Sequence, residues 1–452
     1  MPRLRLAFFS PFNPQRTGVS DYSEELLPCL AEKADVDLVA GPYRLSNKAI
    51  TSRFRLLHGE EFVANAASYD MSIYQIANSF PQHAYMIPFM ESFPGVMVLH
   101  DYYVHYLVLG LTLLRGDFPA LVRILRPVYG AQTPALAWRL LLSVADPYRV
   151  SLTGPLIDLS RAVVTHSQCA RDLVLAERPE KIVRVIPMAM PEIRTEARAA
   201  LRRKYGVGER EFVLASVSTL SYTKRIEVVL SALNALALKD RYDGLRLWIL
   251  GGGRVSNRVR RMMEHPALSG RVHMTGWTPA ETYEELLVAA DAVVDLRYPS
   301  GAETSASLLR AIAAGKPAIV SAQGTFRELP DAFTRKIQVG AGEEERLAAA
   351  IAELIDDVSG RTAMGEAALK HARTHMRLQQ AADAYLDLIR EVNQQPARPA
   401  QTSALRSEAR RGPRLIWASL YKAFRLGYMV RTYGWAATLQ RVRGEAQAGR
   451  RA

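Results

Sequence analysis

The sequence predicts an α/β protein with two doubly wound, largely parallel sheets and a basic helical extension at its C-terminal end. A chain of 452 residues is too long for a single hydrophobic core. Short apolar segments alternate with amphipathic ones in two successive series, as in proteins whose helices cover both faces of a parallel sheet. A hydrophobic share of 49% and a charged share of 23% are typical of a globular protein.

The first series occupies a domain that we expect over residues 1–192. Strands are predicted over 6–12, 36–40, 71–76, 96–100, 162–165 and 183–187, and helices over 20–32 and 168–177. Gly18 lies in the loop after the first strand, where a residue without a side chain lets the backbone approach a ligand. His100 ends another strand, and ligands of such sheets bind at the carboxyl ends of strands. We therefore predict that His100 lines a binding cleft, although a lone histidine is often structural.

Residues 102–155 interrupt the alternation with helical, apolar and basic sequence. The preferred interpretation is a helical excursion that packs on the sheet. The alternative is an apolar and cationic face for a membrane or for a lipid-like acceptor. The proline-containing stretch 188–200 follows the first series and is the predicted interdomain linker.

The second series predicts a second domain over residues 200–375. Its strands are expected over 212–217, 245–250, 271–275, 292–296 and 318–321, followed by helices over 343–357, 361–374 and 378–392. Because the strands again alternate with helical segments, their carboxyl ends should share one edge of a parallel sheet.

The loops after these strands carry cations, glycines and an aromatic ring. Lys224 and Arg225 precede a helix, where cations oppose the helix dipole, so structure alone would favour acids there. Gly251 and Gly252 follow the next strand, and Trp277 follows the one after it. Together they offer cations and amides to a diphosphate and a ring to a base. The alternative is a solvated helix start and a permissive glycine turn.

A turn with one carboxylate, Glu303, lies between the strand over 292–296 and a helix over 307–314. Thr304 and Ser305 precede that helix, whose unpaired N–H groups and partial positive charge suit a phosphate. Gly315 is expected to end the helix, and Pro317 prevents its continuation. The alternative interpretation is an ordinary capped helix in a βαβ crossover.

The formal charge of +13 is concentrated near the C-terminal end. Residues 401–452 hold eleven Arg or Lys and two Glu, a net charge of +9. Basic amphipathic helices, including one over 415–429, suit an anionic membrane over residues 413–443. A helical hairpin docked on the body is the competing interpretation. Nucleic acid is not expected, because no base-reading module is present.

The order of these motifs resembles that of the retaining glycosyltransferases of family four, which have the GT-B fold. The resemblance covers roughly residues 4–392. It rests on Thr17-Gly18-Val19-Ser20, Leu99-His100-Asp101, Thr165-His166-Ser167-Gln168, Val185-Ile186-Pro187-Met188, Lys224-Arg225, Leu250-Gly251-Gly252-Gly253, Thr275-Gly276-Trp277 and the run from Leu309 to Pro317. It implies two Rossmann-like domains facing across a cleft, with the helix over 376–392 crossing back to the first domain and a linker and basic tail over 393–452.

The sequence departs from the family pattern at two places. Thr219 stands where the family has an arginine on the donor diphosphate, and Arg310 stands where it has the second of two glutamates eight positions apart. Glu303 is the remaining candidate for the first glutamate. Some relatives resemble this chain in a Gly-Glu-Thr-Ser turn, so we interpret it as a variant subgroup, with Arg225, Arg297 or Arg310 supplying the missing cation.

The resemblance implies transfer of a sugar from a nucleotide-diphosphate sugar to a glycan or lipid-linked acceptor, with retention and without a metal or other cofactor. His100, Lys224 and Glu303 are the expected catalytic residues. The expected nucleotide-sugar site comprises Gly18, Thr219, Lys224, Arg225, Gly251, Gly252, Trp277, Glu303, Thr304, Ser305 and Arg310. The alternatives are nucleotide-sugar 2-epimerisation and a non-catalytic scaffold for polysaccharide assembly. Two cysteines far apart suggest a reduced, cytoplasmic location, with peripheral membrane attachment through the tail.

Overall fold

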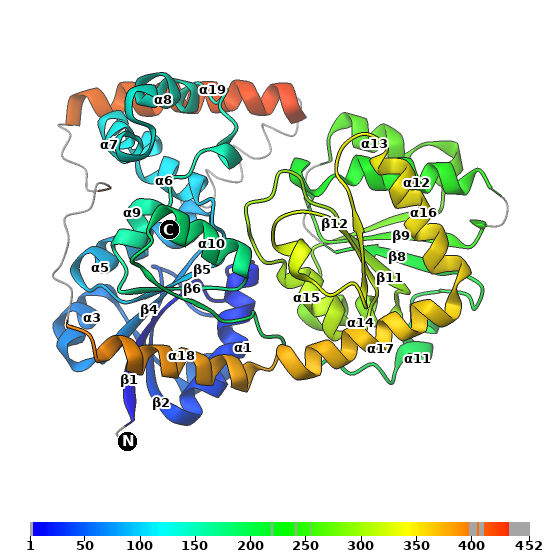
Figure 1. Cartoon of the computed structure of the whole chain (residues 1–452), viewed down its shortest axis with the longest axis horizontal. Coiled ribbons are helices and arrows are strands. Elements are labelled where there is room, and N and C mark those ends of the chain that lie inside the picture. The colour runs from blue at the N-terminus through cyan, green and yellow to red at the C-terminus, as the bar shows by residue number, and fades with distance from the viewer. Residues whose placement is uncertain are drawn as a thin grey trace. The chain divides into compact units, whose positions relative to one another are not determined.

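The computed structural model describes residues 3–217, 220–239, 242–253, 255–396, 405 and 411–433. Thr219 lies outside the described residues, as do residues 434–443 of the predicted membrane-binding stretch 413–443 and most of the predicted linker that begins at residue 393. The chain divides into two compact units. The first holds the described residues of Met1–Pro187, Gly301–Thr304 and Leu378–Ala452, and the second holds those of Met188–Ser300 and Ser305–Arg377. Each unit contains one parallel sheet (Figure 1).

The sheet of the first unit has seven strands in the order β3-β2-β1-β4-β5-β6-β7. Its strands are β1 (Leu4–Phe9), β2 (Ala34–Val39), β3 (Arg55–Leu57), β4 (Met71–Ile76), β5 (Val96–Leu99), β6 (Ala162–Thr165) and β7 (Ile182–Val185). Every pairing is parallel. The prediction omitted β3, because three residues are too few to show an alternating pattern.

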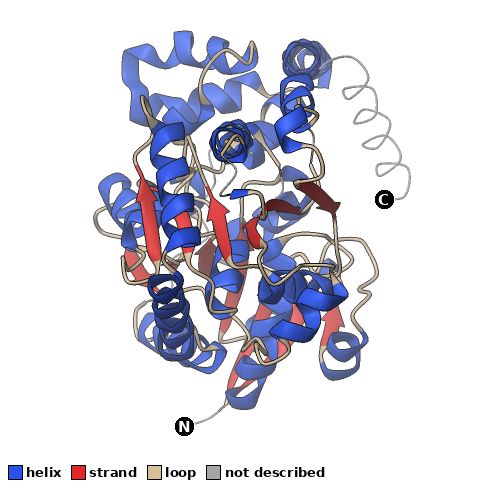
Figure 2. Ribbon diagram, turned by 90° about the vertical axis from the view of Figure 1, so that its right-hand side faces the viewer, coloured by secondary structure: helices blue, strands red, loops and turns tan. Residues whose placement is uncertain are grey.

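Helices lie on both sides of this sheet (Figure 2). They are α1 (Gly18–Lys33), α2 (Lys48–Arg53), α3 (Gly59–Asn65), α4 (Phe80–His83), α5 (Ile87–Ser92), α6 (His105–Leu111), α7 (Phe118–Tyr129), α8 (Thr133–Leu141), α9 (Gly154–Asp158) and α10 (Gln168–Glu177). A late helix, α18 (Leu378–Asn393), also belongs to this unit, and the buried hydroxyls of Tyr22 and Tyr385 join it to α1 at 3.2 Å. The first unit is therefore completed by residues that follow the second.

The helical excursion over 102–155 packs on the sheet, as the preferred interpretation predicted. Leu107, Leu121 and Leu141 are fully buried in the same core as strand residues such as Met97. A further helix, α19 (Arg411–Tyr433), lies along α7 and α8 (Figure 1). None of the described helices combines the length and apolarity needed to cross a bilayer.

The sheet of the second unit has six strands in the order β10-β9-β8-β11-β12-β13, all parallel. They are β8 (Phe212–Ser216), β9 (Leu245–Leu250), β10 (Val272–Gly276), β11 (Ala292–Asp295), β12 (Ala318–Ser321) and β13 (Thr334–Ile337). The prediction omitted β13. This edge strand contains the polar residues Thr334, Arg335 and Lys336, so it lacks the apolar run by which the other strands were predicted.

Helices also flank this second sheet. They are α11 (Arg198–Lys204), α12 (Ile226–Ala237), α13 (Asn257–Met263), α14 (Ala280–Ala289), α15 (Ala306–Ala313), α16 (Glu343–Asp356) and α17 (Val358–His375). Ser305 caps α15 by accepting from Leu308 N, and Gly315 follows the helix with φ of 69°, so the predicted end of this helix is confirmed.

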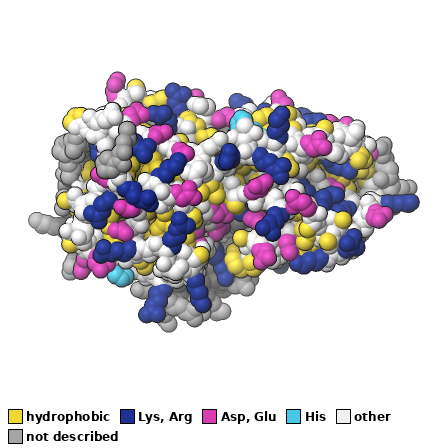
Figure 3. Space-filling model, turned by 90° about the horizontal axis from the view of Figure 1, so that it is seen from below, with side chains coloured by type: hydrophobic (Ala, Val, Ile, Leu, Met, Phe, Trp, Pro, Cys, Tyr) yellow, Lys and Arg dark blue, Asp and Glu magenta, His cyan; other side chains and the backbone are white. Residues whose placement is uncertain are grey.

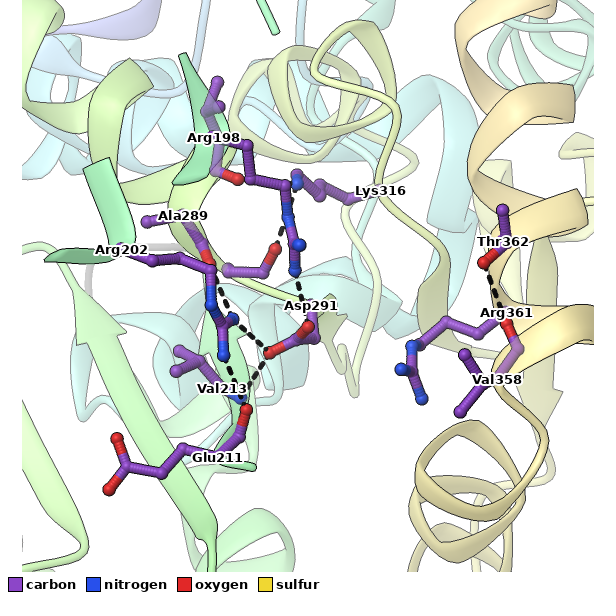
Figure 4. A network of polar contacts seen from close by, with 12 residues as sticks. Arg198, Arg202, Glu211, Val213, Ala289, Asp291, Lys316, Val358, Arg361 and Thr362 are labelled. Carbon is purple, nitrogen blue, oxygen red and sulfur yellow. Dashed lines mark hydrogen bonds and ion pairs between the residues drawn. The ribbon is translucent and has the colours of Figure 1, made fainter. Parts of the chain in front are cut away.

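A polar network at the amino end of β11 connects several elements of the second unit (Figure 4). The Asp291 carboxylate accepts hydrogen bonds from Arg198 at 2.6 Å, Arg202 at 2.8 Å and the backbone N–H of Val213 at 2.8 Å. The buried Lys316 ammonium donates to the carbonyls of Val288 and Ala290 at 2.8 and 2.9 Å. Cations thus satisfy carbonyls at the end of α14, where the helix dipole favours positive charge.

Candidate active site

The strand order of the second sheet reverses between β8 and β11, and ligands of doubly wound sheets bind at the carboxyl ends of strands beside such a reversal. The loop after β8 carries Lys224 and Arg225, and the loop after β11 leads to Ser305 at the start of α15. The topology therefore brings together two loops that are about seventy residues apart in the sequence.

A buried cluster of polar side chains joins these two loops. Asp295, the last residue of β11, accepts a hydrogen bond from the Ser305 hydroxyl at 2.6 Å, and Lys224 Nζ lies 3.8 Å from its other oxygen. Arg297 donates to the Ser305 hydroxyl at 2.9 Å and lies 3.4 Å from the Asp295 carboxylate. Two cations thus lie around one buried carboxylate at the N-terminus of α15, a helix end that suits an anion.

Arg225 lies next to this cluster but turns toward another carboxylate. It has a left-handed backbone, with φ of 51°, and its guanidinium forms an ion pair with the buried carboxylate of Glu343 in the first turn of α16. Its guanidinium also lies 5.7 Å from the ring of Tyr298. The solvated helix start that was the alternative interpretation is not what the structure has, because Arg225 joins α12 to α16.

The glycines after β9 have a geometric role. Gly253 has φ of 147°, and an added Cβ would lie 2.6 Å from the Leu220 carbonyl oxygen, so a side chain is excluded there. Gly251 forms a bridge with Gly276, and the Gly252 carbonyl accepts from Leu220 N at 2.9 Å. These contacts bring the exits of β8, β9 and β10 together. Trp277 follows this junction with 57% of its surface exposed.

Arg310 lies within α15 and pairs with Glu284 on α14, with a nitrogen-to-oxygen distance of 2.5 Å. Its side chain is 11% exposed. The arginine that we expected in place of a family glutamate thus has its own carboxylate partner.

Two strands of the first sheet are followed by a pair of buried histidines. His100 and His166 follow the adjacent strands β5 and β6, and their ring centroids lie 4.9 Å apart, with Tyr22 edge-on to both. His100 Nε2 lies 2.7 Å from the side-chain oxygen of Gln75. Burial, with the neighbouring His166 and His83, holds the pKa of His100 well below 6.5, and burial lowers the pKa of His166 to about 4. Both rings are therefore neutral at pH 7.

The other predicted residues of the first unit lie at the start of a helix and in a loop. Gly18 is the first residue of α1, whose cap is Thr17. Thr304 and Glu303 belong to the segment Gly301–Thr304, which groups with the first unit. The Gly301 carbonyl accepts from Tyr102 N at 3.1 Å, and a Cβ at Gly301 would lie 2.8 Å from a Glu303 oxygen. The Glu303 carboxylate therefore folds back over its own loop.

Residues 197–371 match the family model described as glycosyl transferases group 1. These residues are a group 1 glycosyl transferase domain.

Curated relatives match part of the chain. A GDP-mannose-dependent alpha-(1-6)-phosphatidylinositol monomannoside mannosyltransferase of Mycobacterium tuberculosis is 28% identical over 199 residues, which are 43% of this chain and 51% of the relative. An alpha-monoglucosyldiacylglycerol synthase of Streptococcus pneumoniae is 32% identical over 166 residues, 35% of this chain and 36% of the relative. The chain thus spans about half the length, or less, of these relatives.

Solved structures resemble a larger part of the chain than the curated relatives do. Sucrose-phosphate synthase of Thermosynechococcus elongatus has a TM-score of 0.61 at 16% identity, covering 86% of this chain and 99% of that one. HepE of Anabaena, solved with UDP, has a TM-score of 0.59 at 17% identity, covering 86% and 100%. With its two parallel sheets, the chain therefore has the GT-B fold that was predicted.

Sequence reasoning missed Asp295, the carboxylate around which the cluster of the glycosyltransferase domain is built. The signal was present, since an acid ends an otherwise apolar strand of which every residue is buried. Among the described residues, no three His, Cys, Asp or Glu side chains form a group that could hold a metal ion. In chemical terms the cluster can bind and neutralise a phosphate-bearing group.

Proposed function

We propose that this protein transfers a sugar from a nucleotide-diphosphate sugar to a glycan or lipid-linked acceptor, with retention of anomeric configuration and without a metal. The observation that carries the proposal is the cluster of Lys224, Asp295, Arg297 and Ser305 at the switch-point edge of a group 1 glycosyl transferase domain. The names of two curated relatives contain a glycolipid, phosphatidylinositol monomannoside in one and monoglucosyldiacylglycerol in the other, which supports a lipid-linked acceptor.

In the proposed mechanism the donor diphosphate binds beside Lys224 and Arg297, at the N-terminus of α15. As the glycosidic bond lengthens, negative charge grows on the departing diphosphate, and fixed cations stabilise it more strongly than they stabilise the ground state. Asp295 and Ser305 orient the two cations, so little reorganisation is required during the reaction. In a retaining enzyme of this kind, the departing phosphate takes the proton of the acceptor hydroxyl on the same face of the sugar.

Under this proposal His100 and Glu303 position hydroxyl groups of the sugar. His100 is 6% exposed and uncharged at pH 7, so it acts as a hydrogen-bonding group rather than as a cation. Trp277, which is largely exposed, supplies a ring to the nucleotide base. Peripheral attachment to the cytoplasmic face of a membrane also belongs to this proposal, because a lipid-linked acceptor resides there.

The test has two stages. Thermal unfolding of the full chain is followed with UDP, GDP, dTDP and ADP, since a nucleotide that binds the folded state raises the unfolding temperature. The matching nucleotide sugars are then supplied with candidate acceptors, and the anomeric configuration of the product is read by NMR.

Selective stabilisation followed by an α-linked product from an α-linked donor supports the proposal. An inverted product refutes retention. Stabilisation without transfer or donor hydrolysis supports the scaffold alternative, and conversion of the free donor at its sugar C2 supports the epimerase alternative. No stabilisation by any nucleotide refutes the proposed function.

A further inference from the structure

The C-terminal helix α19 docks on the helical excursion through aromatic side chains. The ring of Trp417 stacks on Phe118 of α7 at 4.8 Å between centroids and 19° between planes, and it meets Trp138 of α8 edge-on at 5.7 Å. Tyr421, one turn further along α19, is only 4% exposed. This docking combines α7, α8 and α19 into one layer of the first unit, visible as the cyan-green and orange-red helices in Figure 1.

Docking leaves a second apolar stripe of α19 partly exposed. Ile416, Leu420 and Phe424 are spaced four residues apart, so they lie along one side of the helix, and they are 62%, 37% and 38% exposed. Val128 of α7 and Trp138 of α8 are each 46% exposed. The layer therefore presents large apolar side chains from all three of its helices, including Trp138, which also contacts Trp417.

The charge of this layer is of one sign. The helices α7, α8 and α19 contain Arg123, Arg126, Arg139, Arg411, Arg414, Lys422, Arg425 and Arg431, and no Asp or Glu. The chain has 45 acids in 452 residues, so 44 residues of average composition would hold about four. By contrast, the face of the molecule in Figure 3 carries cationic and acidic side chains intermixed.

We propose that α7, α8 and α19 together form one surface that binds an anionic lipid bilayer. Exposed Leu, Ile, Phe and Trp side chains enter the interface between headgroups and acyl chains, and the surrounding cations pair with lipid phosphates. A second copy of this chain fits less well, because a self-complementary contact would place cations against cations with no carboxylate to pair them. This inference rests on the membrane attachment included in the proposed function and assigns it to a surface, but vesicle binding can be measured without the transfer reaction, so the two can fail separately.

The experiment is co-flotation of the full chain with phosphatidylcholine vesicles, with and without 30% phosphatidylglycerol. One double variant, Leu420→Asp with Phe424→Asp, introduces charge into the apolar stripe. A second, Arg126→Glu with Arg139→Glu, reverses two exposed cations of α7 and α8. The matched controls lie in the second unit: Leu238→Asp, at a leucine that is 70% exposed, and Arg210→Glu, at an exposed arginine.

We expect flotation with the anionic vesicles only, at least a fivefold loss of binding for each double variant, and no loss for either control. Thermal unfolding of each variant confirms that it is folded. Equal flotation with neutral vesicles, or double variants that bind as the wild type does, overturns the proposal. It is also overturned if the wild type forms a dimer that the Leu420→Asp/Phe424→Asp variant loses, or if it binds DNA in preference to anionic vesicles.

Discussion

The two sheets carry different side chains at the carboxyl ends of their strands. The first sheet ends in buried, neutral rings, with His100 and His166 packed against Tyr22. The second ends in ionic groups, with Lys224 and Arg297 around Asp295. The same topology thus supports a region suited to uncharged hydroxyl groups and a region suited to a charged diphosphate. Function in this fold is decided by side chains at strand ends rather than by the sheet.

The largest expected effect is a loss of stability in acid that originates in the first unit. Burial lowers the pKa of His83 and of His166 to about 4, and that of His105 to about 3. Between pH 6.5 and 4 the unfolded chain binds protons that the folded chain does not, so stability falls as the pH falls. Each histidine contributes a slope of about 1.4 kcal/mol per pH unit.

Urea unfolding of His105→Phe at pH 6.5, 5.5 and 4.5 measures how much of the pH dependence of the free energy of unfolding comes from His105. The variant should lose less stability on acidification than the wild type does. His273→Gln, at an exposed position of the second unit, is the matched control and should behave as the wild type. An unchanged slope in His105→Phe contradicts the assignment.

Next in size is the effect of Lys224→Ala on the proposed reaction. Removing one fixed cation from the departing diphosphate should lower kcat/KM by about 10²–10³-fold. Steady-state kinetics with the nucleotide sugar selected in the binding screen measures the change. Lys239→Ala, at an exposed lysine after α12, should leave the rate unchanged. A Lys224→Ala variant with full activity would remove the donor site from this edge.

A smaller effect is expected at Arg225, whose replacement should lower stability, whereas replacement of Lys224 should lower activity. Arg225→Met leaves the buried carboxylate of Glu343 without its guanidinium partner, so unfolding should become easier by about 2–4 kcal/mol. Chemical denaturation measures this loss, and the double variant Arg225→Met/Glu343→Met should recover part of it. If Arg225→Met instead weakens nucleotide binding at unchanged stability, Arg225 belongs to the donor site.

The last prediction concerns Lys316, which makes the stability of the second unit depend on pH in an alkaline range. Burial, and then the nearby Arg198, lowers the pKa of Lys316 to about 7. Between pH 7 and 10.5 the unfolded chain holds a proton that the folded chain has released, so stability rises with pH by about 1.4 kcal/mol per unit. Lys316→Met should flatten this rise in denaturation at pH 7 and 9, whereas Lys370→Met, at an exposed lysine, should not.

Most strands and several site residues of both units could be predicted from the sequence, because local signals determine where strands end. The apolar runs predicted most of the strands, and Gly315 predicted the end of α15. Lys224 and His100 were predicted as site residues because each follows a predicted strand. The side chains that contact these residues could not be predicted from the sequence. Arg225 pairs with Glu343, which is 118 positions away, and Lys224 faces Asp295 across a strand order that alternation alone does not specify.

The tail shows the same limit in another form. Amphipathic spacing indicated a helix over 415–429, but one apolar face could not be divided between a docked side and an exposed side. Trp417 and Tyr421 pack into the body, whereas Ile416 and Phe424 do not, because only the tertiary contact with Phe118 and Trp138 decides which side is covered.

The position of α18 has a consequence for synthesis on the ribosome. The second unit is inserted between the two halves of the first, so its residues up to Arg377 are all made before the helix that carries Tyr385. The domain that begins first is thus the one that finishes last. Until α18 emerges, the nascent first domain lacks the partner of the buried Tyr22, and the inserted domain is the first to have its complete chain.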